Sequence, residues 1–66
     1  MSEIVKKLST DLAKSGLSQN DFADKLGVSN SNLSEVLNGK RKVNLKFVQK
    51  LHKVLNYDPV FLLDNA

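Results

Sequence analysis

Residues 18–39 have the sequence SQNDFADKLGVSNSNLSEVLNG, and this stretch decides the fold of the 66-residue chain. Ser18 is suited to be a helix N-cap, and Asp21 follows three residues later, as in a short capping box. The next apolar residues lie on one face of a helix and are Phe22, Ala23 and Leu26. Gly27 stands where a helix needs a left-handed terminator. The first half of the stretch therefore predicts a short helix that ends in a tight turn.

A second helix is predicted directly after this turn. Val28 supplies an apolar side chain, and Ser29 is a second N-cap. The apolar residues that follow have helical spacing and are Leu33, Val36 and Leu37. The Asn38-Gly39 pair is a stop signal, because Gly39 can adopt a positive φ. Two short helices joined by a tight turn, the second with small polar side chains outside, suit the reading of a DNA major groove.

Three further helices are expected around this pair. Ser2 can cap a first helix that Gly16 ends, and Leu17 is expected to turn inward between the first two helices. Asn44 can cap a fourth helix that stops near Asn56, and Asp58-Pro59 can open a short fifth one. The apolar residues of these helices are Ile4, Val5, Leu8 and Leu12, then Leu45, Val48, Leu51, Val54 and Leu55, and finally Val60, Phe61, Leu62 and Leu63. Because no window alternates polar and apolar residues as a strand does, we expect an all-α bundle of five helices, one domain over residues 1–66.

Composition limits the possible classes of protein. A 66-residue chain is near the lower size limit for a self-sufficient core. It holds no cysteine, which excludes disulfides and thiolate zinc sites, and no metal or cofactor is expected. No apolar run approaches the roughly 20 residues of a membrane helix, and no signal peptide is apparent. The sequence therefore predicts a soluble cytoplasmic domain.

Charge is segregated along the chain. Residues 36–57 contain six basic residues and no acidic one, whereas the remainder holds four basic and seven acidic residues. A solvated helix surface would normally mix the two signs. Segregation by segment points to a polyanionic partner, against the alternative of a merely lysine-rich surface.

The chain closely resembles the phage repressor and Cro family of helix-turn-helix DNA-binding domains. The residues that carry this resemblance are Gln19, Ala23, Gly27, Val28, Ser29, Leu33 and Asn38-Gly39. The first and fourth helices and the closing DPVFLL segment also match the family's five-helix layout. The resemblance implies that the helix after Ser29 enters the major groove of double-stranded DNA.

The resemblance also implies which residues read bases. The candidates are Asn30, Ser31, Asn32, Ser34 and Glu35. Asn30 stands where the family usually has glutamine, and asparagine can make the same bidentate contact to adenine through an arm one methylene shorter. For Glu35 three interpretations stay open. It accepts a hydrogen bond from cytosine, it forms an ion pair with a neighbouring basic residue such as Lys40, or it repels DNA of the wrong sequence.

Phosphate contacts are expected from helix ends and from the basic segment that follows the second helix of the motif. By resemblance, Gln19 and Asn38 bind the DNA backbone, although Asn38 can equally be an ordinary helix stop. Lys40, Arg41 and Lys42 follow directly and should add salt-sensitive affinity, with a minor-groove contact by Arg41 left open. Lys46, Lys50 and Lys53 share a face of the fourth helix, which we expect to be solvated.

We expect a homodimer on a near-palindromic operator, because a single domain of this kind offers few base contacts. Phe61, with Tyr57 nearby, is the expected dimer patch, whereas Val60 and Leu63 are expected to cover the core.

Three classes of function follow. The first is a sequence-specific transcriptional regulator, a repressor by preference, with an antitoxin or restriction-controller role indistinguishable from it. The second is a protein-binding adaptor that has kept the fold but not DNA binding. The third, an enzyme, has no support, because His52 is the one histidine and no glycine-rich phosphate loop or metal-ligand spacing occurs.

Overall fold

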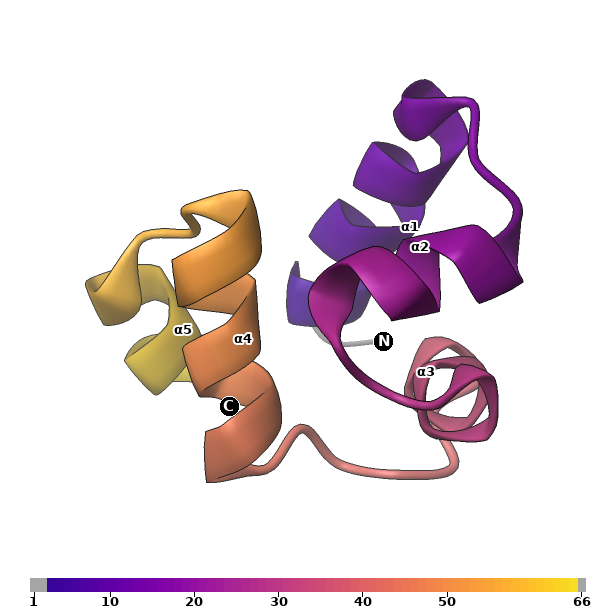
Figure 1. Ribbon diagram of the computed structural model, residues 1–66. Coiled ribbons are helices and arrows are strands. Elements are labelled where there is room, and N and C mark those ends of the chain that lie inside the picture. The colour runs from indigo at the N-terminus through magenta and orange to yellow at the C-terminus, as the bar shows by residue number, and fades with distance from the viewer. Residues whose placement is uncertain (1–2, 66) are drawn as a thin grey trace.

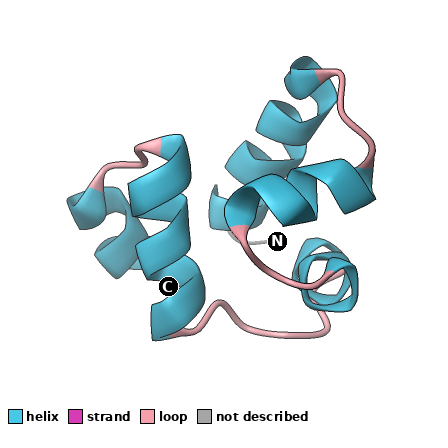
Figure 2. Ribbon diagram, viewed as in Figure 1, coloured by secondary structure: helices cyan, strands magenta, loops and turns pink. Residues whose placement is uncertain are grey.

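Five helices succeed one another in the computed structural model, which describes residues 3–65. They are α1 (Glu3–Ser15), α2 (Gln19–Leu26), α3 (Asn30–Leu37), α4 (Leu45–Leu55) and α5 (Pro59–Asn65) (Figure 1). Residues 3–65 include no strand (Figure 2). The predicted all-α arrangement of five helices is therefore confirmed, while the cap expected at Ser2 lies outside the described residues.

Local capping interactions start and stop the helices where the sequence predicts. The Ser18 hydroxyl accepts from the Asp21 N–H at 3.1 Å, and the Ser29 hydroxyl accepts from the Asn32 N–H at 3.1 Å. Gly27 ends α2 with φ +81°, a conformation that costs an L side chain energy. These caps make the turn between α2 and α3 short, and so fix how the two helices cross.

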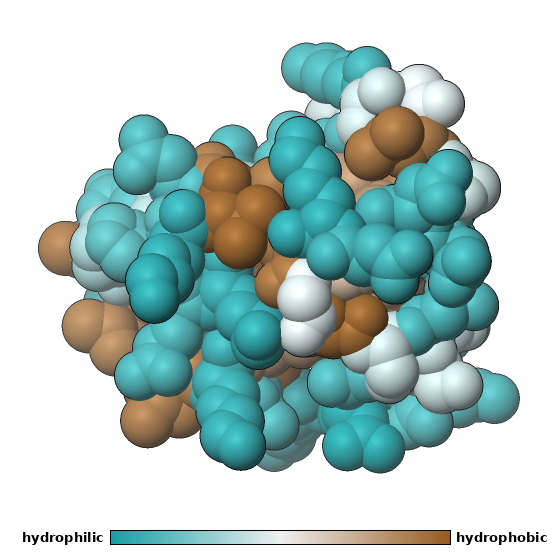
Figure 3. Space-filling view, in the orientation of Figure 1, coloured by the Kyte–Doolittle hydropathy of each residue, from teal (hydrophilic) through white to brown (hydrophobic). Residues whose placement is uncertain are grey.

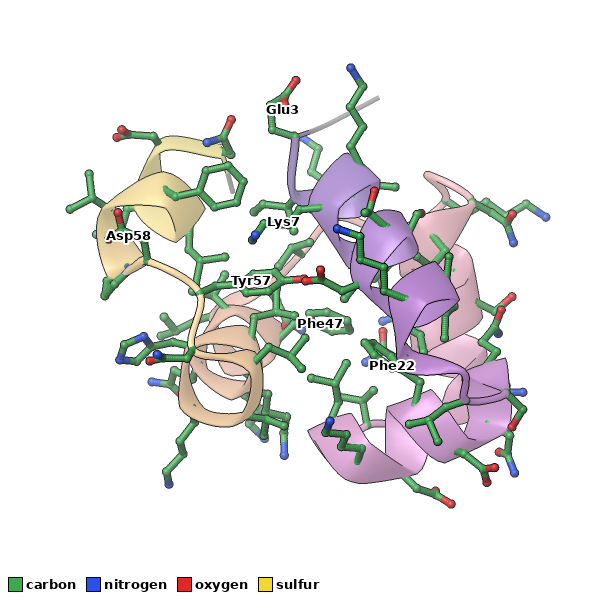
Figure 4. All side chains as sticks on the ribbon, turned by 90° about the horizontal axis from the view of Figure 1, so that it is seen from above. Glu3, Lys7, Phe22, Phe47, Tyr57 and Asp58 are labelled. Atoms are coloured by element: carbon green, nitrogen blue, oxygen red, sulfur yellow. The ribbon has the colours of Figure 1, made fainter. Side chains whose placement is uncertain are left out.

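A small apolar core holds the helices together. Every helix contributes to it, and its twelve buried members are Ile4, Val5, Leu8, Phe22, Ala23, Leu26, Leu33, Val36, Phe47, Leu51, Tyr57 and Leu62. The rings of Phe22 and Phe47 point toward one another in the interior (Figure 4). Apolar burial contributes about 25 cal/mol per Å², so this one cluster must supply most of the driving force for folding.

Tyr57 joins the loop before α5 to α1. The side chain is only 4% exposed, and its hydroxyl donates to Asp11 Oδ2. The Lys7 ammonium lies 4.9 Å from the centre of the ring, between α1 and the α5 side of the molecule (Figure 4). Burial, with the Asp11 carboxylate as hydrogen-bond acceptor and neighbouring charge, raises the pKa of the Tyr57 phenol well above its usual range. Tyr57 is therefore part of the core, and its buried side chain does not contribute to the surface expected for the dimer patch.

The inward face of α5 also differs from the prediction. Leu62 is fully buried and Phe61 is partly buried, whereas Val60 and Leu63 are 63% and 73% exposed. Four consecutive apolar residues have no period, so only the docking of α5 onto the core determines which of them point inward. Val60 and Leu63 therefore do not cover the core.

Two further expectations about apolar residues need correction. Leu17 is 39% exposed and does not lie between α1 and α2, because its N–H donates to Ser15 Oγ in a turn that keeps residue 17 at the surface. On α4, Leu45 and Val54 are exposed, whereas Leu51 is buried as expected, together with Phe47, which the prediction did not include. None of the helices within residues 3–65 combines the length and apolar character needed to cross a membrane.

Candidate DNA-binding surface

Helix α3 is anchored by one face and open on the other. Leu33 and Val36 are completely buried, which turns the first residues of the helix outward. Asn30 and Ser31 are exposed there, next to the N-terminal end of α3. Short polar side chains on a helix fixed in this way can approach base edges closely.

Gln19 and Asn30 are joined across the turn between the two helices. Gln19 Nε2 donates to Asn30 Oδ1 at 3.0 Å, so the first residue of α2 holds the first residue of α3. The Asn30 amide nitrogen keeps its two N–H donors, and Gln19 keeps its own carbonyl oxygen as an acceptor. The bond restricts the Asn30 side chain to an orientation that α2 determines.

The middle of α3 is less open than its start. Asn32 is half-buried, and its Oδ1 atom is buried with no hydrogen-bond partner among the described residues. Its amide oxygen is thus not accessible to a ligand at this surface. Ser34 is also half-buried, and its hydroxyl lies 3.4 Å from Asn38 Nδ2, which is a long and weak hydrogen bond.

Of the three interpretations of Glu35, the structure contains the ion pair with a nearby basic residue, and that residue is Arg41. Arg41 Nε donates to Glu35 Oε2 at 3.0 Å. The Glu35 carbonyl also accepts from the Lys40 N–H at 2.8 Å and the Arg41 N–H at 3.3 Å. Residues 40 and 41 therefore fold back over the C-terminal end of α3, and Lys40 and Lys42 are exposed beside it.

One of the three lysines of α4 is not part of a solvated face. Lys46 and Lys53 are exposed, whereas Lys50 is half-buried, and its ammonium is 3.1 Å from the position that a Cβ on Gly27 would occupy. A cation is favourable at the C-terminal end of α2, where the helix dipole is negative. Lys50 thus lies against the turn of the motif, which the sequence-based prediction missed.

A common pattern connects these contacts. Three hydrogen bonds each join a residue predicted to read bases with one predicted to bind phosphate, and the pairs are Gln19 with Asn30, Asn38 with Ser34, and Arg41 with Glu35. Sequence alone could not reveal these pairs, because they depend on the crossing of α2 and α3 and on the path of residues 38–44. Gly39, with φ +74°, is the sequence signal that the chain reverses there.

Possible metal ligands do not gather into a metal-binding group in the part of the chain that the structure describes. Residues 3–65 contain no group of three or more histidine, cysteine or acidic side chains that could hold a metal ion. His52 is exposed on α4, where its Nδ1 lies 2.9 Å from the Tyr57 carbonyl oxygen.

Known proteins share this architecture. The model of a helix-turn-helix family matches residues 3–62. The chain belongs to the Cro/C1-type helix-turn-helix family. This assignment confirms the resemblance to phage repressors and Cro and gives the chain a DNA-binding domain of the lambda-repressor-like type. Members of this family are typically regulators without enzymatic activity.

A solved structure is similar over most of the chain. It comes from Nostoc punctiforme PCC 73102, and its protein has the provisional description of an antidote protein of a plasmid maintenance system. The TM-score is 0.81 at 30% sequence identity over 91% of this chain. The match spans 66% of the Nostoc chain, somewhat under two thirds. No curated protein sequence matches.

Proposed function

We propose that this chain is a sequence-specific transcriptional regulator that inserts α3 into the major groove of an operator. The observation that carries the proposal is the combination of the exposed Asn30 and Ser31 at the start of α3 with the exposed positive segment Lys40–Lys42 that follows the helix. Short uncharged side chains distinguish base edges, and the cations next to them neutralise phosphates. Repression is the simplest outcome, because a protein seated on a promoter excludes polymerase. Such a regulator acts in the cytoplasm, in association with the nucleoid.

Binding as a dimer is part of this proposal. One copy of α3 reads few base pairs, and two copies related by a two-fold axis read a near-palindrome with half-sites one helical turn apart. The exposed side chains of Val60 and Leu63 on α5 offer an apolar surface for the second copy. They replace Tyr57 in the predicted dimer patch, to which the partly buried Phe61 contributes only its exposed edge.

Selection from a random duplex library at physiological salt tests the proposal. We expect enrichment of a near-palindrome whose half-sites have centres about ten base pairs apart. If no sequence is enriched while binding still varies with salt, attraction to DNA is purely electrostatic and the proposal fails. No salt-dependent affinity for duplex DNA at all would favour a protein-binding adaptor.

A role as the antidote of a plasmid maintenance system is the second candidate, and the similarity to the Nostoc protein favours it. This role adds a protein partner to DNA binding and does not exclude it. Growth of a host that expresses the gene adjacent to this one, with and without this chain, distinguishes the two. If the adjacent gene is toxic and the chain restores growth, the antidote role is supported. If the adjacent gene is not toxic, the function as an operator-binding regulator is favoured.

A further inference from the structure

Glu35 occupies a position that neither DNA phosphates nor the dipole of its own helix favour. It is the one acidic residue between positions 25 and 57, and it lies in the last turn of α3. The C-terminal end of a helix disfavours a carboxylate, because the dipole there is negative. DNA phosphates repel the same charge. Unless it contacts a base directly, its presence on the candidate DNA-binding surface requires a partner within the protein.

The contacts of Glu35 identify that partner. Its side chain, 42% exposed, accepts from the Nε–H of Arg41, whose side chain is 50% exposed. Its carbonyl accepts from the backbone N–H groups of Lys40 and Arg41. Arg41 is thus fixed to α3 through both its main chain and its side chain. The contact uses one of the five guanidinium N–H donors, so the four on the two Nη atoms are not needed for it.

We propose that Glu35 is a positioning residue for Arg41, and that the pair contributes to the discrimination between operator and other DNA. This inference rests on the proposed function. Arg41, held at a fixed place relative to α3, donates through its Nη groups to a phosphate that is within reach only when α3 is seated in register. An arginine on a loose segment would instead contribute equally on any sequence. Lys40 and Lys42, with exposed side chains in the same segment, supply this uniform affinity.

The experiment compares Glu35→Ala with the native chain on the selected operator and on a shuffled duplex, over a range of salt concentrations. We expect the affinity for shuffled DNA to rise, because a negative charge is lost. The ratio of the two affinities should fall about two- to fivefold, the range typical of coupling in an exposed ion pair. Glu35→Gln keeps an acceptor for Arg41, so its ratio of operator affinity to shuffled-duplex affinity should lie between those of Glu35→Ala and the native chain. Asp24→Ala, which removes an exposed acid from α2, is the matched control and should leave the ratio unchanged.

A second background tests whether Glu35 acts through Arg41. In Arg41→Gln, the further change Glu35→Ala should not alter the ratio. An equal fall in both backgrounds, or the same fall in Asp24→Ala, would overturn the proposal, because Glu35 would then act by direct contact or by charge alone.

A measurement without DNA separates this inference from the proposed function. Hydrogen exchange of the Arg41 Nε–H, followed by NMR in the free protein, should be slower in the native chain than in Glu35→Ala. Equal rates would overturn the positioning role. A native chain that prefers no duplex would overturn the proposed function and the specificity that rests on it, and the exchange rates alone would then decide whether Glu35 holds Arg41.

Discussion

At the scale of single residues, Tyr57 makes the stability of the domain sensitive to alkaline pH. The pKa of its phenol is raised in the folded chain above the ordinary value of about 10. The folded state therefore holds this proton more tightly, and the contribution to stability is complete below pH 10 and is lost as pH rises further. In Tyr57→Phe we expect the free energy of unfolding at pH 7 to fall by about 1 kcal/mol, the typical value of one hydrogen bond.

Urea unfolding of both proteins from pH 7 to pH 11 checks this prediction. The native chain should lose more stability than Tyr57→Phe between pH 9 and pH 11. The two proteins differ only in the hydroxyl of residue 57, so the difference between the two curves isolates the phenol. Parallel curves would contradict the assignment of the raised pKa to Tyr57.

Asn30 is the residue whose loss should change base preference most clearly. Its side chain is exposed at the start of α3 and is oriented by Gln19. We expect Asn30→Ala to weaken operator binding by about 1–3 kcal/mol and to relax preference at one base pair of each half-site. Repeating the duplex selection with this variant measures both effects. Ser9→Ala, an exposed substitution on α1, should reproduce the native site, and an unchanged site with Asn30→Ala would remove Asn30 from the base-reading set.

At the scale of elements, the segment between α3 and α4 should supply affinity without specificity. Neutralising Lys40 and Lys42 by Lys→Gln should weaken binding about equally on operator and shuffled duplex. The plot of log affinity against log salt should become shallower by about 2, since each phosphate contact contributes a slope of about 0.9. The same change at Lys46 and Lys53, exposed on α4, is the matched control and should have a smaller effect. An unchanged salt slope in the first variant would mean that these two lysines do not contact phosphate.

Helix boundaries were predictable from sequence because local interactions determine them. A serine or asparagine cap bonds an N–H three residues away, as Ser18, Ser29 and Asn44 do, and a glycine permits the positive φ at residue 27. The face that α5 turns inward was not predictable, because VFLL is apolar all round and tertiary docking selects Leu62.

Site residues show the same division. The elements that carry the candidate residues were predictable from motif spacing. The partnership of Glu35 with Arg41 was not, since it depends on a chain reversal at Gly39 that brings residues six positions apart together.

At the scale of the whole molecule, polar and apolar surfaces are distributed unevenly. Most of the surface seen in Figure 3 is hydrophilic, with apolar residues in separate groups, some of them along the edge that α5 occupies. On α5, Val60 and Leu63 are one helical turn apart and both exposed, with Leu62 anchoring the opposite face. A helix fixed in this way can present apolar side chains to a second copy without any rearrangement of the core.

The dimer predicted from this surface can be tested by comparing the affinities for DNA with one half-site and for DNA with the full palindrome. Val60→Lys combined with Leu63→Lys places like charges on both sides of the two-fold axis and should prevent association. The fold should survive, because neither side chain belongs to the core. Binding to a duplex with one half-site should then be nearly unchanged, whereas affinity for the full palindrome should fall about tenfold or more, since linkage of the two copies is lost. Sedimentation equilibrium with each duplex measures stoichiometry, and Leu17→Lys, at the exposed loop between α1 and α2, is the control.

Two copies bound as tightly to the full site in the α5 variant would mean that contacts other than Val60 and Leu63 join them. A native chain that binds the two half-sites independently would mean that the operator, not a protein interface, brings the copies together.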